Sequence, residues 1–371
     1  MIIKMELLKK SKLIKFLVLF LPIVLLFTHC TNSEKQETEN ENLIVLKNGN
    51  TTLKVLPSMG GRIVSFQRNN SNNILKSDPN LWNYKFERPV DELILNDMIP
   101  FNGHIVWVGP QSEWWINQDI DKELKKRASD WPPDPYLIYG DYKVIKKTGN
   151  YVKLRGPKSE YTGIQLTKDI TLKENGKVVF TVEAQNIREE PIAWDLWLNT
   201  RMDGFDKVYV PIANENDLRM EHRVTETTEE MPYKIDNGYF HFETLSPPAN
   251  KSKRYGKAFI YPSKNELFAF TKNDMFVIHF KKYSRKLVHP EQGLIEIYNS
   301  VTDSGDALME IEYHTPYQVI QPKEKISGKE VWEVVEYRNG NNTEDHIDFI
   351  NVYLDLKKKT KRNREYVKLS R

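Results

Sequence analysis

The sequence has only one cysteine, Cys30, among 371 residues. The chain therefore cannot form an intramolecular disulfide, and its stability must come from the burial of apolar side chains. A phosphate-binding glycine loop, a nucleophile elbow and a dinucleotide fingerprint are also absent, so the sequence gives no support to nucleotide-dependent or serine-hydrolase chemistry. Roughly 300 residues follow the amino-terminal segment, enough to bury ~75% of the surface that an unfolded chain exposes.

The sequence also has no strong excess of charge of one sign. Its formal net charge is +3, and five lysines and Glu6 near the amino terminus contribute +4, which leaves −1 for the rest. One local basic group lies near the other end: Lys357, Lys358, Lys359, Lys361, Arg362 and Arg364. Such a group is typical of a solvated tail, although it could contact phosphate or anionic lipid. We expect no nucleic-acid partner, because no basic aromatic surface motif is present.

The amino-terminal segment is typical of a signal peptide. Basic residues precede an apolar run from Phe16 to Phe27, which is shorter than the ~20 residues that span a bilayer as a helix. A short membrane anchor is the alternative. Cys30 follows the run directly and precedes a polar stretch, an order that resembles a bacterial lipoprotein signal. We therefore expect residues 1–30 to be a leader with lipid attached at Cys30 and 31–42 to be a flexible tether. This predicts an exported, lipid-anchored protein of the cell envelope, on the outer-membrane or periplasmic side.

From residue 43 onward, apolar and polar residues alternate between turn signals, which predicts more than ten strands and an all-β sandwich or barrel. Helical patterning is scarce. Residues 119–127 predict about two turns capped by Asp119, and residues 347–356 fit either an edge strand or a short helix. We expect a β domain over residues 43–340 and a basic appendage over 341–371. The predicted strands are 43–47, 53–57, 142–146, 151–154, 165–172, 178–184, 257–261, 267–271, 276–280, 294–298, 308–313 and 331–337.

Residues 101–139 contain an unusual concentration of aromatic and polar side chains. Four of the eight tryptophans lie there, together with Gln111. Each tryptophan by itself is more simply explained as core, but irregular, proline-broken segments seldom lie wholly inside a core. Indole faces beside amides and carboxylates suit sugar rings, so the group predicts a carbohydrate site. The four predicted ligand-binding tryptophans are Trp107, Trp114, Trp115 and Trp131.

Short motifs add a family resemblance over roughly residues 43–337. The run PSMGGRI at residues 57–63 resembles the early strand and turn of aldose 1-epimerases, or galactose mutarotases. The stretch NGHIVWVGPQ at residues 102–111 resembles the active-site loop of a diverged, uncharacterised bacterial branch of that superfamily. IEIYN at 295–299 and MEIEY at 309–313 follow in the expected order. The resemblance implies a large antiparallel β-supersandwich of the galactose mutarotase-like kind.

The resemblance also implies roles for particular residues. His104 matches a histidine that binds substrate oxygen, and Glu310 or Glu312 is the candidate base of an acid–base pair. A second family histidine is expected near residues 197–201, and none occurs there. Arg201 could instead bind an anionic sugar such as a uronate, or pair structurally with Asp203 or Asp195. The resemblance adds Arg62 and Asn199 to the predicted ligand-binding residues.

These features predict carbohydrate binding at the cell envelope, with a sugar or glycan as ligand. One alternative is an enzyme, either an aldose 1-epimerase-type isomerase or a glycosidase that uses two carboxylates. The other is a non-catalytic envelope scaffold. We expect no cofactor and no metal. His222 with Glu221 and His289 with Glu291 have no ligand spacing that points to a metal site.

Overall fold

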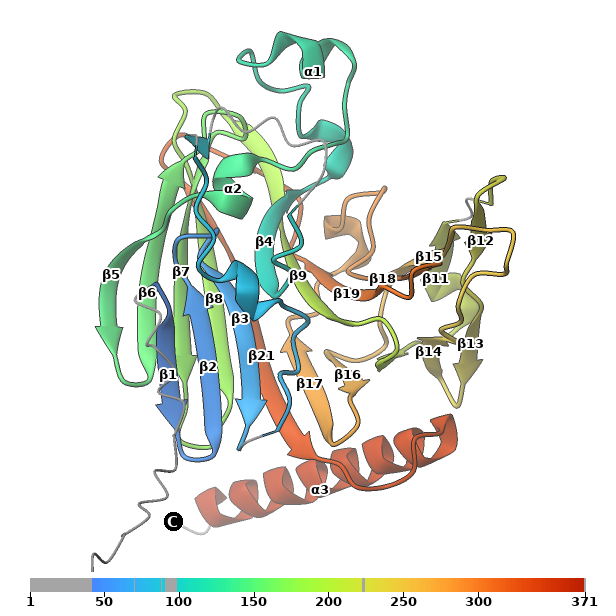
Figure 1. Ribbon diagram of the computed structural model, residues 1–371. Helices are drawn as coiled ribbons and strands as arrows, with labels where there is room; N and C mark the ends of the chain where they lie inside the picture. Colours follow the sequence, from blue (N-terminus) through green and yellow to red (C-terminus); the bar gives the residue numbers. More distant parts are fainter. Residues whose placement is uncertain (1–41, 70, 88, 91–98, 222–223, 370–371) are drawn as a thin grey trace, which may run out of the picture. The chain divides into compact units, whose positions relative to one another are not determined.

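The computed structural model describes residues 42–69, 71–87, 89–90, 99–221 and 224–369, all within one unit of the chain. The predicted leader, the lipid site at Cys30 and nearly all of the predicted tether lie outside these residues. The described part consists of two large sheets, which we call sheet A and sheet B, and three α-helices (Figure 1). Neighbouring strands are antiparallel except for one short pair, so the predicted all-β sandwich is confirmed. No helix among the described residues is long and apolar enough to cross a membrane.

Sheet A has 11 strands and carries the candidate site. Along its main path, each strand between the terminal strands β1 and β11 pairs with a neighbour on both sides. Its order is β1 (Ile44–Asn48), β2 (Thr51–Leu56), β3 (Arg62–Arg68), β4 (His104–Gly109), β9 (Ile192–Asp203), β19 (Ala307–His314), β18 (Ile295–Thr302), β15 (Lys253–Ile260) and β11 (Leu218–Glu221), with β12 (Thr228–Glu230) paired to β15 and β20 (Gln318–Ile320) paired to β9.

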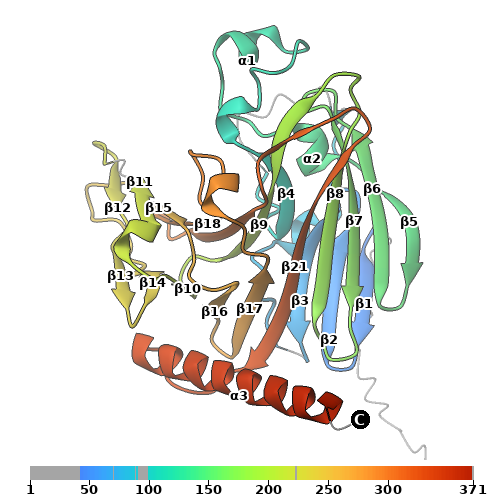
Figure 2. The same cartoon turned by 180° about the vertical axis from the view of Figure 1, so that it is seen from behind.

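Sheet B has 10 strands and packs against one face of sheet A (Figure 2). Its order is β13 (Tyr233–Asp236), β14 (Tyr239–Phe242), β10 (Lys207–Pro211), β16 (Glu266–Phe270), β17 (Asp274–Phe280), β21 (Lys325–Glu336), β8 (Val178–Asn186), β7 (Ile164–Leu172), β6 (Tyr151–Lys158) and β5 (Lys143–Thr148). Phe66 of sheet A meets Phe276 and Trp332 of sheet B, with ring centroids 5.9 and 5.8 Å away. This face-to-face packing forms the core of the sandwich.

The turn between β2 and β3 depends on two glycines. Gly60 and Gly61 have φ of +72° and +57°, a region that residues with a side chain rarely adopt. A Cβ on Gly60 would also lie 2.6 Å from the carbonyl oxygen of Ile138. The paired glycines therefore let the turn pass close to the backbone of α2 (Pro135–Tyr139).

The helices correct two of the expectations from sequence. The first helix, α1 (Lys122–Lys126), is capped by Asp121, whose Oδ1 accepts from the backbone N–H groups of Glu123 and Leu124, and not by Asp119. Residues 347–356, which fitted either a strand or a helix, lie inside α3 (Thr343–Leu369), which runs past the ends of β16 and β17 (Figure 1). Three buried apolar residues of α3 pack in one cluster with Tyr209, Phe268 and Phe270 of sheet B; they are Ile347, Ile350 and Leu354. This part of the carboxy-terminal segment is therefore packed on the sandwich.

Candidate functional site

A ligand-sized cleft lies on the face of sheet A that points away from sheet B. His104 and its register partner Thr200 point toward sheet B, where the His104 ring meets Phe180 and Trp332 at 4.6 and 4.9 Å. Because side chains alternate along a strand, Trp107 points to the opposite face, together with its partner Trp197. An open cleft of about 550 Å³ lies there, within the range of small-molecule sites. We call this hollow the cleft.

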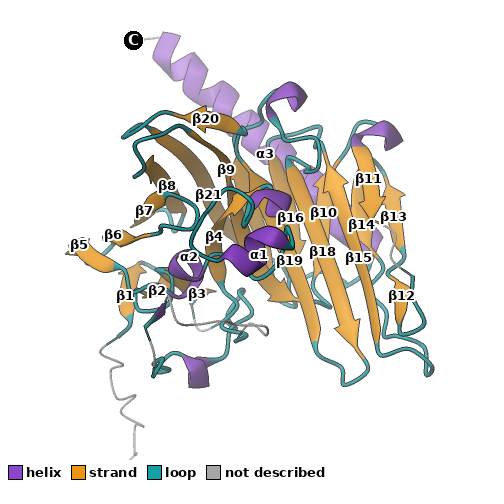
Figure 3. Cartoon of the chain, turned by 90° about the horizontal axis from the view of Figure 1, so that it is seen from above, coloured by secondary structure: helices purple, strands orange, loops and turns teal. Residues whose placement is uncertain are grey.

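Strand register places two rows of side chains on this face of sheet A; the first row and Glu312 of the second form the floor of the cleft. Facing residues of β9, β19, β18, β15 and β11 form these rows, and Figure 3 shows the last four of these strands side by side. The first row runs Arg201, Glu310, Tyr298, Lys257, Glu221. The second row runs Asn199, Glu312, Glu296, Phe259, Arg219. The floor therefore combines carboxylates, cations and aromatic rings on one face of one sheet.

Two cations neutralise most of the negative charge in these rows. Arg201 Nε lies 2.6 Å from Glu310 Oε1, and both side chains are almost fully buried. Lys257 Nζ lies 2.7 Å from Glu296 Oε2 and also pairs with Glu312. Burial alone would lower the pKa of Lys257, but the two carboxylates raise it above its ordinary value. Lys257 therefore stays charged throughout the physiological range.

The pKa values of the carboxyl groups in these rows are shifted in opposite directions. Burial acts to raise the pKa of Glu310, but the charge of Arg201 outweighs it and holds the pKa below its usual range. The pKa of Glu296 is likewise lowered, since Lys257 and His314 outweigh burial. The pKa of Glu312 is raised well above its ordinary value by burial and by the charges of its neighbours Glu296 and Glu310, although Lys257 opposes this. One ammonium cannot compensate two buried carboxylates fully, so Glu312 is the group that tends to hold a proton.

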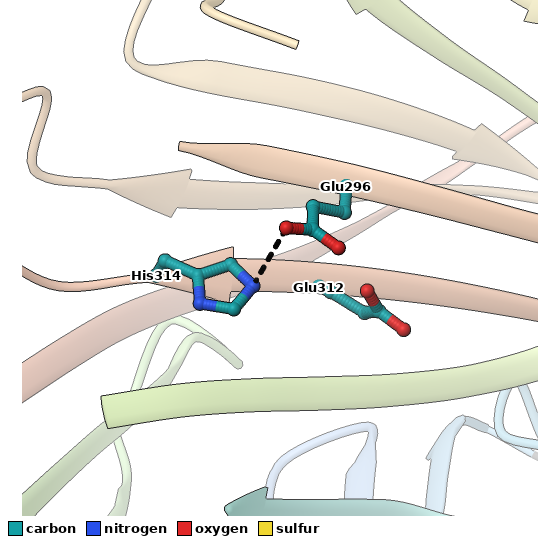
Figure 4. Close-up of side chains that lie close together, drawn as sticks. All are labelled: Glu296, Glu312 and His314. Atoms are coloured by element: carbon teal, nitrogen blue, oxygen red, sulfur yellow. Dashed lines mark ion pairs between the residues drawn. The ribbon is translucent and has the colours of Figure 1, made fainter. Parts of the chain in front are cut away.

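Glu296 and Glu312 of the second row form a compact cluster with His314 (Figure 4). Each offers one donor atom within 4.8 Å of the others, which makes the group a candidate set of metal ligands. His314 Nε2 lies 3.4 Å from Glu296 Oε1, and His314 Nδ1 lies 3.1 Å from Asp195 Oδ1. Both carboxylates already contact Lys257, so a metal ion would have to displace its ammonium. We therefore assign the charge compensation of this cluster to Lys257.

Tryptophan rings form one wall of the cleft. Trp107 and Trp197 line it, with ring centroids 5.0 Å apart and planes at 74°. Their Nε1 atoms are buried without a hydrogen-bond partner among the described residues. Trp131 lies at the rim with 36% of its surface exposed. Trp131 is therefore the ring of this wall that is most open to a ligand.

The structure brings six of the predicted site residues to the cleft and a seventh beside it. The six lining residues are Trp107, Gln111, Trp131, Arg201, Glu310 and Glu312. Asn199 is fully buried next to them, with its amide nitrogen 3.4 Å from Glu312 Oε1. The amide nitrogen of Gln111 donates to the carbonyl of Asp130, another lining residue, at 2.7 Å.

The placement of His104 contradicts its predicted catalytic role. It lies on the sheet-B face of β4, 1% exposed, with Nδ1 3.0 Å from Thr200 Oγ1. Burial, with the charges of Lys168 and Arg62, places its pKa well below 6.5, so the ring is neutral near pH 7. It cannot contact a ligand held on the opposite face of the sheet, and its surroundings are those of a core residue.

Three further residues that were predicted to bind a ligand are buried and donate to backbone carbonyls instead. Arg62 is completely buried and donates to the backbone carbonyls of Met59, Asn102 and Ile138. Burial, with a smaller effect of Arg201, lowers its pKa to about 9. Trp114 and Trp115 are 2% and 3% exposed and donate from Nε1 to the carbonyls of Val108 and Pro132. Their polar atoms are used within the fold, which leaves them no role in direct binding.

Several residues of the cleft were not predicted from the sequence. Lys253, Tyr255 and Lys257 lie on one face of β15 and all line the cleft. Tyr298, another lining residue, lies on the neighbouring strand β18, and Glu296 of the same strand pairs with Lys257. The alternation over residues 253–259 was a usable signal, since it places Lys253, Tyr255, Lys257 and Phe259 on the same face. Only the pairing of β15 with β18, and of β18 with β19, shows that this face meets Glu310 and Glu312, and the sequence does not reveal these pairings.

Comparison with solved structures returns mutarotase-like proteins, the group that the sequence motifs resemble. A putative aldose 1-epimerase from Escherichia coli K12 is 10% identical, with 80% of this chain and 99% of that chain covered and a TM-score of 0.49. A galactose mutarotase-like protein from Clostridium acetobutylicum is 12% identical, with 80% and 95% covered and a TM-score of 0.46. Galactose 1-epimerase from Lactobacillus acidophilus NCFM is 11% identical, with 80% and 95% covered and a TM-score of 0.42.

A search of curated proteins finds none that matches this chain. The sequence model of one family matches residues 42–335, which is most of the chain and nearly all of both sheets. The match agrees with the expectation of an uncharacterised, diverged family. The chain therefore belongs to the family of the domain of unknown function DUF4380.

Proposed function

We propose that the cleft binds carbohydrate. The observation that carries this proposal is the joint presence of tryptophan rings and hydrogen-bonding side chains around one open hollow of about 550 Å³. Aromatic faces suit the C–H surfaces of sugar rings, while carboxylates and amides accept and donate to hydroxyl groups. Trp131 at the rim supplies the first kind of contact, and Glu310, Glu312 and Gln111 supply the second.

The charge pattern of the cleft favours a sugar over a nucleotide or another polyphosphate. Arg201 and Lys257, two of the three cations that line the cleft, are engaged by carboxylates, so neither presents an unshared positive charge to an anion. The third, Lys253, lies over the rings of Tyr255 and Tyr298. Glu221 and Asp130 add further negative charge to the lining. A polyhydroxylated ligand can exchange hydrogen bonds with such paired groups without upsetting their charge balance.

Replacing Trp131 with Ala tests the proposal. We expect the variant to bind its best glycan about 1–3 kcal/mol more weakly than the wild type, the scale of losing an aromatic contact at a binding site. Isothermal titration calorimetry on the strongest glycan-array ligand gives this difference. Phe205→Ala is the matched control, because Phe205 is 50% exposed but does not line the cleft. Equal affinities for the wild type and Trp131→Ala would refute a sugar site at this wall.

Epimerase-type chemistry is a second candidate function, favoured by the opposed pKa shifts of Glu310 and Glu312. Carboxyl groups whose pKa values are pushed apart can serve as base and acid. However, no histidine among the described residues lines the cleft, and a lowered pKa makes Glu310 a weak base. We therefore expect polarimetry to show anomers of glucose and galactose interconverting at the solvent rate. General acid–base catalysis would accelerate the interconversion by ~10²–10⁴-fold. Acceleration of this size that is abolished in Glu312→Gln would contradict the expectation and make catalysis the proposed function.

We also propose that the protein acts at the cell envelope through lipid on Cys30. The support is the basic segment, the apolar run and the single cysteine that follows it. Cys30→Ala should move the protein out of the membrane fraction or leave an unprocessed precursor. Intact membrane recovery of this variant, together with an unlipidated wild-type amino terminus in mass spectrometry, would contradict the proposal.

A further inference from the structure

The cleft continues into two further hollows along sheet A. A second hollow of about 220 Å³ shares Gln111, Trp197 and Lys257 with the cleft, and extends to Glu296 and Phe259. A third hollow of about 360 Å³ shares Phe259 and Gln292 with the second, and is also lined by Arg219. Because each hollow shares its wall residues with the next, the three adjoin one another. Together these three adjoining hollows, which we call the groove, extend further along sheet A than the cleft alone.

The groove follows strand β15. Lys253 and Tyr255 line the cleft, Lys257 lines both the cleft and the second hollow, and Phe259 lines the second and third hollows. These four alternate residues point to one face of the strand, and each step between them covers ~6.6 Å. The line from Lys253 to Phe259 is therefore ~20 Å long, about four times the ~5 Å between neighbouring strands.

Each end of this line has a flat, polar-edged contact surface. Lys253 Nζ lies 5.6 and 5.4 Å from the ring centroids of Tyr255 and Tyr298 at the cleft end. At the other end, the guanidinium carbon of Arg219 lies 3.6 Å from the centroid of Phe259. Arg219 is exposed and lines the third hollow; its Nη2 donates to the backbone carbonyl of Glu291, and the other donors of the planar guanidinium, which is stacked on the ring, can meet a ligand. Paired carboxylates and Lys257 lie between the two ends.

We propose that the ligand is a chain of at least three sugar units that lies along β15, with its far unit against the Arg219–Phe259 stack. This inference rests on the proposed function and specifies its substrate class. A single monosaccharide would fill only the cleft and leave the second and third hollows unused. A linear glycan uses all three, because its repeating rings and hydroxyls match the repeating aromatic and polar contacts along the strand.

The test measures how binding affinity depends on the length of the oligosaccharide, with the third hollow intact or altered at Arg219. Calorimetric titrations use cello-, malto-, manno- and galacto-oligosaccharides, each as monomer, dimer and trimer, against the wild type and Arg219→Ala. We expect the trimer of the recognised series to bind the wild type about tenfold or more tightly than its monomer. Arg219→Ala should lose most of this gain and keep the monomer affinity. Arg219 is exposed, so the variant should keep its fold, and Phe259→Leu provides a second change at the same place.

Different failures separate the two proposals. Equal binding of monomer and trimer to the wild type, or an Arg219→Ala variant that keeps the full gain, would overturn the extended groove. The proposal of a sugar site in the cleft would then depend only on the result for Trp131→Ala. Absence of binding in all four series at millimolar concentration, with a correctly folded wild type, would overturn the extended groove and the proposed function together.

Discussion

Replacing Lys257 with Met should lower the free energy of unfolding by about 3–5 kcal/mol, the cost of removing one partner from a buried ion pair. Lys257 is the cation shared by Glu296 and Glu312, whose side chains are 3% and 1% exposed. Met preserves most of the volume, so the loss reports the unpaired carboxylates. Urea unfolding measures it. The double variant Lys257→Met with Glu312→Gln should recover part of the stability, because one of the two charges is then gone.

The loss should depend on pH in a defined direction. In the wild type the raised pKa of Lys257 means that its contribution is complete below the ordinary lysine value of ~10.4 and is lost only at higher pH. In the variant, burial without the cation raises the pKa of both carboxyls. A carboxyl with a raised folded pKa destabilises above its unfolded value of ~4.3, and protonation at lower pH relieves this. The deficit should therefore shrink from about pH 8 toward about pH 5; a constant deficit would contradict the charge account.

His104→Ala should destabilise the protein by about 2–5 kcal/mol, as other large-to-small core substitutions do, and leave glycan affinity unchanged. The reason is the position of the ring between Phe180 and Trp332, on the face of β4 opposite the cleft. His104→Phe, which keeps a ring but loses the contact with Thr200, should cost less. Unfolding and binding are measured on the same samples. A variant with wild-type stability and lost binding would restore the role that the family resemblance implied.

Alternation gave the half-buried strands reliably, because polar and apolar residues mark their two faces. β7 and β8 show this most clearly, with every second residue buried. The strands β4 and β9 were missed by this criterion, since nearly all of their residues are buried and both faces are apolar or internally paired. The motif resemblance covered the first of these segments, but it assigned residues 102–111 to an active-site loop, and the structure shows that β4 lies within them.

The candidate site was predictable in its parts but not in its assembly. Glu310 and Glu312 were expected from the family resemblance and Trp131 from the concentration of aromatic side chains, and all three line one cleft. The face on which His104 lies depends on strand register, which one sequence does not reveal, so its placement was wrong. Lys257 was missed for a similar reason. A lysine on an alternating strand suggests a solvent face, and only the pairing of β15 with β18 places it between two buried carboxylates.

The central claim, that the cleft on sheet A binds carbohydrate, is tested most directly by a crystal structure of the wild-type protein. The crystals would be soaked with the glycan that gives the strongest signal on a glycan array. We predict sugar density in the cleft, with a ring against Trp131 and hydroxyl groups within hydrogen-bonding distance of Glu310 and Gln111. Sugar bound on another surface, or no array glycan that binds the folded protein, would contradict the account.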